Sequence, residues 1–219
     1  MPYYINDKQI SLDDLAARIM ESDLVPSRAV LRDNIDENFA KLKASGIQTL
    51  ADLRKTVKNA KNIALVEQTG LGRDYLTLLR REVESYFSKA VSLRDFAWLE
   101  QSKIAQLAIL GYKNTEQFFD AVEAAGGIQA FVPSATGLDK DFLDTLFMLS
   151  GLTRIQWVSP LFAKMLFEAG YPDAPSIAAA DAESLCRAVE AINVQHGYFK
   201  GNIGLRDIMR LIKSSSYIS

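Results

Sequence analysis

The sequence is poor in the residues that build disulfide frameworks and metal centres. Its 219 residues include one cysteine, Cys186, and one histidine, His196. A single cysteine forms no disulfide within the chain, and these two residues are too few for a Cys/His zinc site, which takes three or four protein ligands. We therefore expect no metal and no cofactor. The lone cysteine is typical of a reducing compartment.

Long apolar runs are missing as well. No stretch approaches the roughly eighteen apolar residues of a membrane span. The first residues lack the basic region followed by an apolar one that marks a signal peptide. We expect a cytoplasmic protein without membrane contact. Hydrophobic residues make up 48% of the chain and charged residues 24%, a composition typical of globular proteins that bury a core of their own.

Signatures of catalysis are equally scarce. The sequence has no P-loop, no Rossmann glycine pattern, and no serine or cysteine nucleophile in a recognisable turn. His196 lies in a predicted loop without a catalytic partner, and we interpret Cys186 as a small buried residue. The carboxylate pairs Asp13/Asp14 and Asp139/Asp141 fit the acidic first turns of helices. We expect no enzyme activity.

What the sequence does contain is an internal repeat. Leu42, Leu107 and Leu166 each lie four residues before a glycine, and an isoleucine or tyrosine follows that glycine. The three glycines are Gly46, Gly111 and Gly170. This spacing predicts three helices that each bury a leucine and end at a glycine in the left-handed conformation.

A second motif recurs in the same order. Gly70-Leu71-Gly72 is echoed by Gly137-Leu138-Asp139 and by Gly204-Leu205-Arg206, and the leading glycines are 67 residues apart both times. Two motifs that recur in one order predict tandem copies of one helical module.

The start of each copy carries a third echo. The opening segments are Leu31-Arg32-Asp33, Leu93-Arg94-Asp95 and Leu152-Thr153-Arg154. Trp98 and Trp157 occupy matched positions, each 13 residues before its glycine. We expect both rings to be buried as packing residues.

These patterns predict an all-α protein of three tandem repeats, each about 65 residues long. The predicted segments are an N-terminal part at 1–24, a first repeat at 25–91, a second at 92–151 and a third at 152–219. No linker rich in proline, glycine or serine separates the copies. We therefore expect them to stack into one elongated body.

Local signals add detail at the helix ends. Ser11, Thr49 and Ser92 are each followed three residues later by an aspartate, which predicts helix N-caps with an acidic partner. Tyr3–Ile5 is the one strand candidate, so we expect a short N-terminal strand or extended segment.

The run from Leu31 to Ile212 resembles the helix-hairpin-helix class, and more closely an uncharacterised family called domain of unknown function 4332. The resemblance rests on short helices joined by glycine-containing turns, and on segments such as Leu152-Thr153-Arg154-Ile155 and Lys200-Gly201-Asn202-Ile203-Gly204-Leu205. The family carries no established activity. The wider class implies that hairpin backbone N–H groups hold a nucleic-acid phosphate.

Glycines are required in such a hairpin because only they let the backbone approach a phosphate without a Cβ in the way. Gly70-Leu71-Gly72 has both glycines, whereas the second copy has Asp139 and the third has Arg206 in the last place. The hairpin positions that precede the other glycine motif contain no glycine. They hold Asp33-Asn34-Ile35, Trp98-Leu99-Glu100 and Trp157-Val158-Ser159. One hairpin of six therefore keeps the pattern.

That hairpin lies in the most basic part of the chain. Residues 25–91 carry 12 basic and 8 acidic side chains, whereas residues 92–151 carry 4 and 8. The candidate phosphate-binding residues are Gly70, Gly72, Arg73, Arg54, Lys58, Lys61, Arg80 and Arg81. The alternative is a solvated helix surface with a hairpin kept for its turn geometry.

Two functions follow from these features. The first is a non-catalytic interaction scaffold that presents stacked helices to an unknown protein partner, and it predicts an exposed apolar patch. The second is sequence-independent binding of a DNA or RNA backbone through the basic first repeat. We favour the scaffold because most hairpins have lost their glycines.

Overall fold

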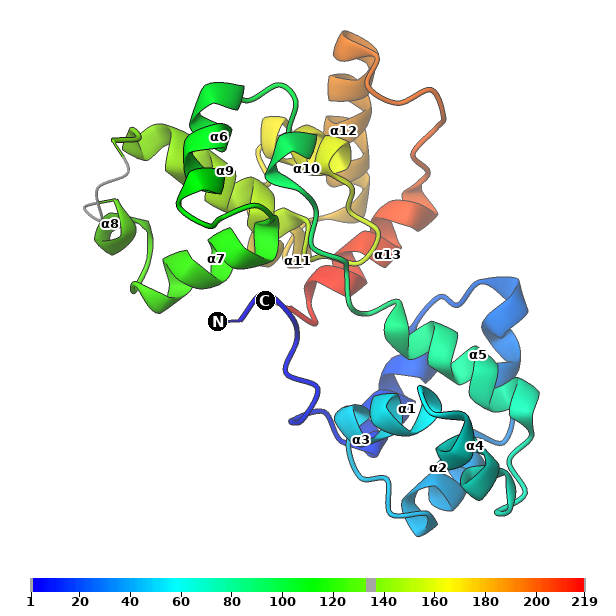
Figure 1. The fold of residues 1–219 in the computed structure, drawn as a ribbon. Coiled ribbons are helices and arrows are strands. Elements are labelled where there is room, and N and C mark those ends of the chain that lie inside the picture. The colour runs from blue at the N-terminus through cyan, green and yellow to red at the C-terminus, as the bar shows by residue number, and fades with distance from the viewer. Residues whose placement is uncertain (1, 133–136, 219) are drawn as a thin grey trace. The chain divides into compact units, whose positions relative to one another are not determined.

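The computed structural model describes residues 2–132 and 137–218, and it is all-helical over them. The chain divides into two compact units (Figure 1). The small unit is Asn6–Phe87, and the large unit is Met1–Ile5 together with Ser88–Ser219. Residues 6–24, predicted to be part of an N-terminal segment, fold in the small unit together with most of the predicted first repeat.

The small unit has six helical segments. They are α1 (Leu12–Glu21), η1 (Pro26–Arg32), α2 (Ile35–Ala44), α3 (Leu50–Val57), α4 (Ala60–Glu67) and α5 (Arg73–Glu84). Its core is mainly aliphatic, and Leu12, Leu15 and Ile19 of α1 are fully buried with Leu53 of α3 and Leu79 of α5. The spacing of Leu12, Leu15 and Ile19 is that of one helical face, which is why α1 belongs to this core.

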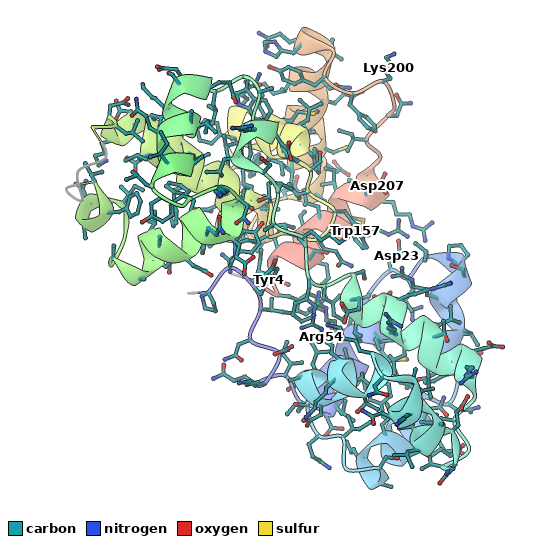
Figure 2. The ribbon with its side chains drawn as sticks, viewed as in Figure 1. Tyr4, Asp23, Arg54, Trp157, Lys200 and Asp207 are labelled. Carbon is teal, nitrogen blue, oxygen red and sulfur yellow. The ribbon has the colours of Figure 1, made fainter. Side chains whose placement is uncertain are left out.

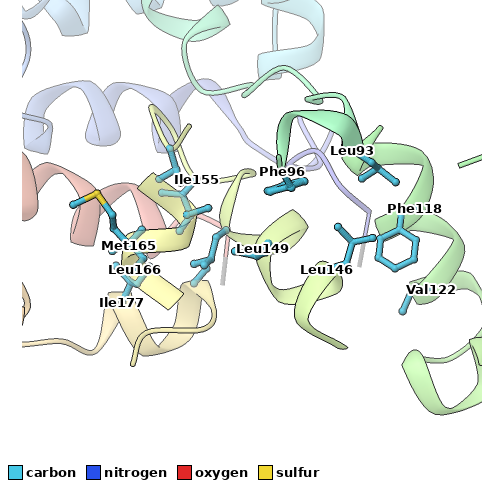
Figure 3. Packing of buried hydrophobic residues seen from close by; sticks show 14 of the residues in the cluster. Leu93, Phe96, Phe118, Val122, Leu146, Leu149, Ile155, Met165, Leu166 and Ile177 are labelled. Atoms are coloured by element: carbon cyan, nitrogen blue, oxygen red, sulfur yellow. The ribbon is translucent and has the colours of Figure 1, made fainter. Parts of the chain in front are cut away.

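The large unit holds the remaining helices. They are η2 (Leu93–Asp95), α6 (Gln101–Ile109), α7 (Thr115–Ala124), α8 (Ile128–Phe131), α9 (Lys140–Leu152), α10 (Pro160–Glu168), α11 (Ala174–Ala178), α12 (Ala182–His196) and α13 (Leu205–Ser215). The second and third predicted repeats share one hydrophobic core here (Figure 3). α9 joins them, because it packs against α7 on one side and α10 on the other.

The predicted helix ends at the first glycine motif are present in all three copies. Gly46, Gly111 and Gly170 have φ of +83°, +100° and +89°. In each case the next residue donates its N–H to the carbonyl of the motif leucine, at 3.3 Å for Leu42 and 2.9 Å for both Leu107 and Leu166. These are the closing bonds of Schellman motifs. The three leucines are fully buried.

The second glycine motif has a different register in the third copy. Gly72 and Asp139 are the N-cap residues of α5 and α9, and Gly204 is the N-cap residue of α13. Gly204 therefore corresponds to Gly72, and not to Gly70 as we predicted. Its φ of −80° needs no glycine, whereas Gly70 has a φ of +86°. The three residues that end at the N-cap are thus Gly-Leu-Gly before α5, Gly-Leu-Asp before α9 and Asn-Ile-Gly before α13.

Each unit contains an isolated backbone bridge. Leu12 N donates to Gln48 O and Leu50 N to Ile10 O, an exchange that forms an isolated bridge between Ser11 and Thr49. The large unit has the same exchange between Ser92 and Asn114. Ser11 at the start of α1 thus makes the same backbone exchange in the small unit as Ser92 makes in the large unit, while Leu31 and Leu93 both lie in short 3₁₀ segments, η1 and η2.

Two further expectations are corrected. Among the described residues no strand forms beyond the isolated bridges, so Tyr3–Ile5 is not a strand, and the backbone bends at Tyr3 and Tyr4. Trp98 packs against the core of the large unit, but Trp157 is 60% exposed. Trp157 has a φ of +67°, a left-handed conformation that bulky residues rarely adopt.

The predicted caps form where a full helix follows. Ser11 with Asp14, and Thr49 with Asp52, make reciprocal capping boxes at α1 and α3. Ser92 caps only the short η2, through the N–H of Arg94. Hydrogen bonds from Ser11 hold the pKa of Asp14 below its usual value, and those from Thr49 do the same for Asp52.

Candidate functional site

The Gly70-Leu71-Gly72 hairpin joins α4 to α5 in the small unit. Leu71 is buried and anchors the turn, while Gly72 precedes α5 without any side-chain cap. The Gly70 N–H is already used, because it donates to Glu67 O at 3.0 Å. A Cβ at Gly72 would meet nothing within 4 Å, so the uncapped N–H groups in the first turn of α5 are open to an anion.

The cations beside this hairpin each have a carboxylate partner. Arg73 Nε lies 3.2 Å from Glu67 Oε1. Lys41 Nζ lies 4.0 Å from the Cβ position of Gly70, and it is 2.7 Å from Glu37 Oε1. Sequence reasoning missed Lys41, because α2 reaches the hairpin only through tertiary packing. Carboxylates this close weaken the attraction of the hairpin for a phosphate.

Arg54 is a structural residue and not an available phosphate ligand. Its guanidinium lies 3.1 Å from Glu84 and 2.7 Å from Asp7, and its Cζ is 3.5 Å from the centre of the Phe87 ring (Figure 2). Burial opposes its charge, but the hydrogen bonds to Glu84 and Asp7 raise the Arg54 pKa. Lys58 Nζ shares Glu84 at 3.8 Å.

The eight predicted residues do not form one site. α5 has twelve residues, begins directly after Gly72 and ends at Glu84. Arg54 and Lys58 contact Glu84, so they lie about 18 Å along the helix axis from the hairpin. Lys61 is exposed in the first turn of α4, and Arg80 and Arg81 are exposed near the end of α5. A single phosphate at the hairpin therefore meets only Gly70, Gly72 and Arg73 among them.

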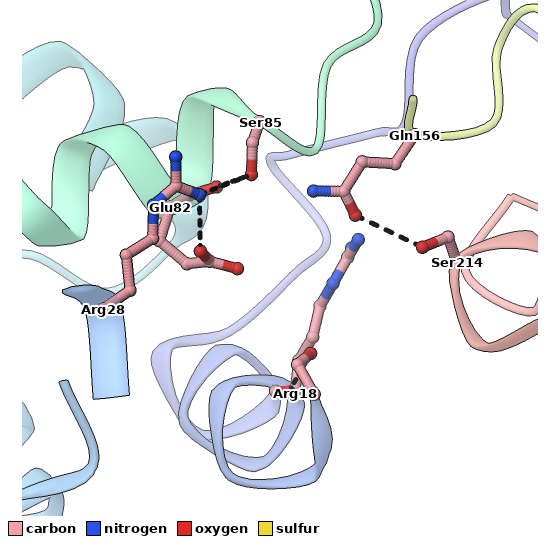
Figure 4. A network of polar contacts seen from close by, with 7 residues as sticks. Arg18, Arg28, Glu82, Ser85, Gln156 and Ser214 are labelled. Atoms are coloured by element: carbon pink, nitrogen blue, oxygen red, sulfur yellow. Dashed lines mark hydrogen bonds and ion pairs between the residues drawn. The ribbon is translucent and has the colours of Figure 1, made fainter. Parts of the chain in front are cut away.

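The charge of the small unit is balanced. Residues 6–87 carry 13 basic and 13 acidic side chains, because the acidic residues of 6–24 fold into the same unit as the basic first repeat. Figure 4 shows an ion pair within this unit: Arg28 Nη1 lies 2.8 Å from Glu82 Oε2 and 3.3 Å from Ser85 Oγ. Glu82 is buried, so this ion pair neutralises a carboxylate within the fold.

Residues that could bind a metal do not gather in the described parts of the chain. No group of three or more His, Cys, Asp or Glu residues among them could hold a metal ion. His196 is the last residue of α12 and stacks on Tyr198, with ring centroids 5.0 Å apart. Cys186 is half-buried, and its Sγ lies 3.6 Å from Ile203 O.

In the large unit, a second polar contact in Figure 4 joins Gln156 to Ser214 of α13 at 3.3 Å.

Over the described residues, every helix is too short or too polar to cross a bilayer. No family model matches the chain, and no curated protein or solved structure shows significant similarity to it. The geometry therefore stands alone in the argument for function.

Proposed function

We propose that the protein is a non-catalytic interaction scaffold whose partner binds the large unit at α12 and α13. The observation that carries the proposal is a set of exposed apolar side chains on one stretch of chain. Val194 is 80% exposed, Phe199 53%, Leu205 42% and Met209 58%. We refer to these four residues as the α12–α13 surface.

The loop between the two helices is fixed in place, so the surface is preformed. The Asn193 side chain accepts from Phe199 N at 2.7 Å and donates to Phe199 O at 3.0 Å. At the other end of the loop, Cys186 Sγ donates to Ile203 O. Both anchors are on α12, and α12 packs against α13.

The two exposed apolar residues of α13 share one helical face. Leu205 and Met209 are four residues apart, while Ile208 and Leu211 are buried in the core. Full burial of a leucine or methionine side chain by a partner contributes about 1.5–3 kcal/mol. Two such side chains on one face therefore provide a useful anchor for a protein partner.

Comparative capture tests the proposal. The bait is the full chain, and the test variant carries Leu205→Asp and Met209→Asp. The control is Leu65→Asp, because Leu65 is 62% exposed on α4 of the small unit. We expect a protein retained by the wild type and by the control to be lost from the test variant. Equal retention by all three baits would refute the assignment.

A second candidate is binding of a nucleic-acid backbone by the small unit. The observation in its favour is the uncapped N-terminus of α5 at Gly72, together with the exposed Lys61, Arg80 and Arg81. The balanced charge of residues 6–87 and the carboxylate partner of Arg73 count against it. We therefore rank it second.

Fluorescence anisotropy of labelled DNA and RNA at low and moderate salt tests this candidate. The informative variant is Gly72→Asp, because Asp139 occupies the same N-cap position in the large unit and accepts from Phe142 N at 2.8 Å. The fold should therefore tolerate the change while a negative charge fills the anion position. Salt-sensitive binding that Gly72→Asp abolishes would support the candidate, and no binding at low salt would reject it.

A further inference from the structure

The N-terminal segment belongs to the large unit, although the chain that follows it builds the small unit. Tyr3 is 2% exposed. Its phenol oxygen accepts from Thr115 Oγ1 at 2.9 Å and lies 3.1 Å from Thr153 Oγ1. Its ring meets Phe119 edge-on, with centroids 5.9 Å apart. A tyrosine is thus held at both its ring and its hydroxyl.

The backbone of the segment is recognised as well. Tyr3 N–H donates to Asp120 Oδ1 at 2.7 Å. Arg154 donates from Nε to Tyr3 O at 2.8 Å and from Nη2 to Pro2 O at 3.2 Å. Arg154 is only 8% exposed, and its guanidinium lies 4.5 Å from the centre of the Phe119 ring. A buried arginine thus donates hydrogen bonds to the backbone carbonyls of Pro2 and Tyr3.

Tyr4 adds a contact at the edge of this site. Its hydroxyl donates to Glu116 Oε2 at 3.3 Å (Figure 2). The contacting side chains come from α7 and from the turn after α9, so they lie 112 to 152 residues away in sequence. Residues 2–5 themselves form neither helix nor strand. The segment therefore lies against the helices of the large unit through contacts with residues distant in sequence.

We propose that this surface is a peptide-binding site, and that the N-terminal segment is its tethered ligand. The site takes a non-helical segment with a tyrosine, recognised through the phenol hydroxyl, the tyrosine N–H, the tyrosine carbonyl and the carbonyl of the preceding residue. The residues involved differ from those of the α12–α13 surface, so this inference goes beyond the scaffold proposal and stands without it.

The partner chemistry follows from these contacts. A segment of another protein binds here when it presents a tyrosine in the backbone conformation of residues 2–4 and displaces them. The tether keeps the chain's own segment at an effective concentration on the order of millimolar. A competing segment therefore binds when a substitution weakens binding of the tethered segment, or when the competing segment itself has high affinity for the site.

The test uses the full chain with Tyr3→Ala and the synthetic peptide Met1–Lys8. We expect the peptide to raise the Tm of Tyr3→Ala by about 5 °C or more at a hundredfold excess over its Kd. Wild-type protein should show no shift, because its site is filled. A peptide with Tyr3→Phe should bind at least about fivefold more weakly, since it lacks the phenol hydroxyl. An unchanged Tm for folded Tyr3→Ala would overturn the proposal.

A second arrangement covers the case in which Tyr3→Ala does not fold. A protease site is inserted between Ile5 and Asn6 of wild-type protein, and the folded protein is cut there. We expect the cut segment to stay bound and to exchange with a fluorescent Met1–Lys8 peptide, which anisotropy follows. If the cut protein releases the segment and takes up no labelled peptide at millimolar concentration, the segment is only a part of the fold and the proposal fails.

Discussion

Replacing Tyr3 separates the contribution of its ring from that of its hydroxyl. In Tyr3→Phe the hydroxyl is lost, but Thr115 and Thr153 keep other partners. Thr115 Oγ1 accepts from Val91 N at 3.1 Å, and Thr153 Oγ1 donates to Ser150 O at 2.8 Å. Each hydroxyl keeps one bond, but the proton of the buried Thr115 hydroxyl loses its acceptor, so the loss should be about 1–2 kcal/mol. Tyr3→Ala also empties a buried ring site, which costs about 3–5 kcal/mol.

The assay can report on the large unit alone. Both tryptophans, Trp98 and Trp157, lie in it, so tryptophan fluorescence in urea follows its unfolding while circular dichroism follows both units. We expect Tyr3→Ala to lower the fluorescence midpoint sharply, Tyr3→Phe to lower it slightly, and the small unit to keep its stability. A Tyr3→Ala midpoint equal to that of the wild type would refute the buried role of the ring. An equal loss in both units would refute its placement.

Other predictions concern backbone conformation and ionisation. Trp157→Gly should raise the free energy of unfolding of the large unit by about 1 kcal/mol, because a φ of +67° is strained for tryptophan; a loss of stability in urea unfolding would contradict this. Gly70→Ala should destabilise the small unit by about 1 kcal/mol, because the φ of Gly70 is +86°. Gly72→Ala should be nearly neutral, because the φ of Gly72 is −67°. Equal losses of stability in the two variants would be inconsistent with the hairpin geometry. Burial raises the pKa of Tyr75 to about 12, so the folded state holds this proton more tightly than the unfolded state. The small unit should then lose stability from pH 10 to 12, and Tyr75→Phe should lose less over that range.

Sequence reasoning succeeded where the signal is local. A glycine that ends a helix and a serine that begins one act through bonds within a few residues, so the ends at Gly46, Gly111 and Gly170 and the caps at Ser11 and Thr49 could be predicted from spacing. The all-helical fold class follows from the same periodic pattern.

Sequence reasoning failed where the contact is distant. Nothing near Tyr3 in sequence reveals that Thr115 and Thr153 hold its hydroxyl, more than a hundred residues away. The same limit explains why Arg54 was taken for a phosphate ligand, since its partner Glu84 comes from another helix. A charged residue on a helix face looks available until the tertiary fold supplies its counterion.

The register error at Gly204 has a different cause. A glycine can end one helix in the left-handed conformation or begin the next as an N-cap, and the letter alone does not distinguish these roles. Gly204 takes the second role and Gly70 the first. The buried residues after the cap resolve the register, because Leu76, Leu143 and Ile208 are each the fourth residue after their caps.

The claim that a partner binds the α12–α13 surface is tested most directly by mapping the bound surface on the folded protein. A ¹H–¹⁵N correlation spectrum of the full chain, recorded with and without the captured partner, reports which amides change. We predict that the changes centre on residues 190–213, and that Leu205→Asp with Met209→Asp removes them. Changes centred on residues 54–84 of the small unit would contradict the account and favour the glycine hairpin instead.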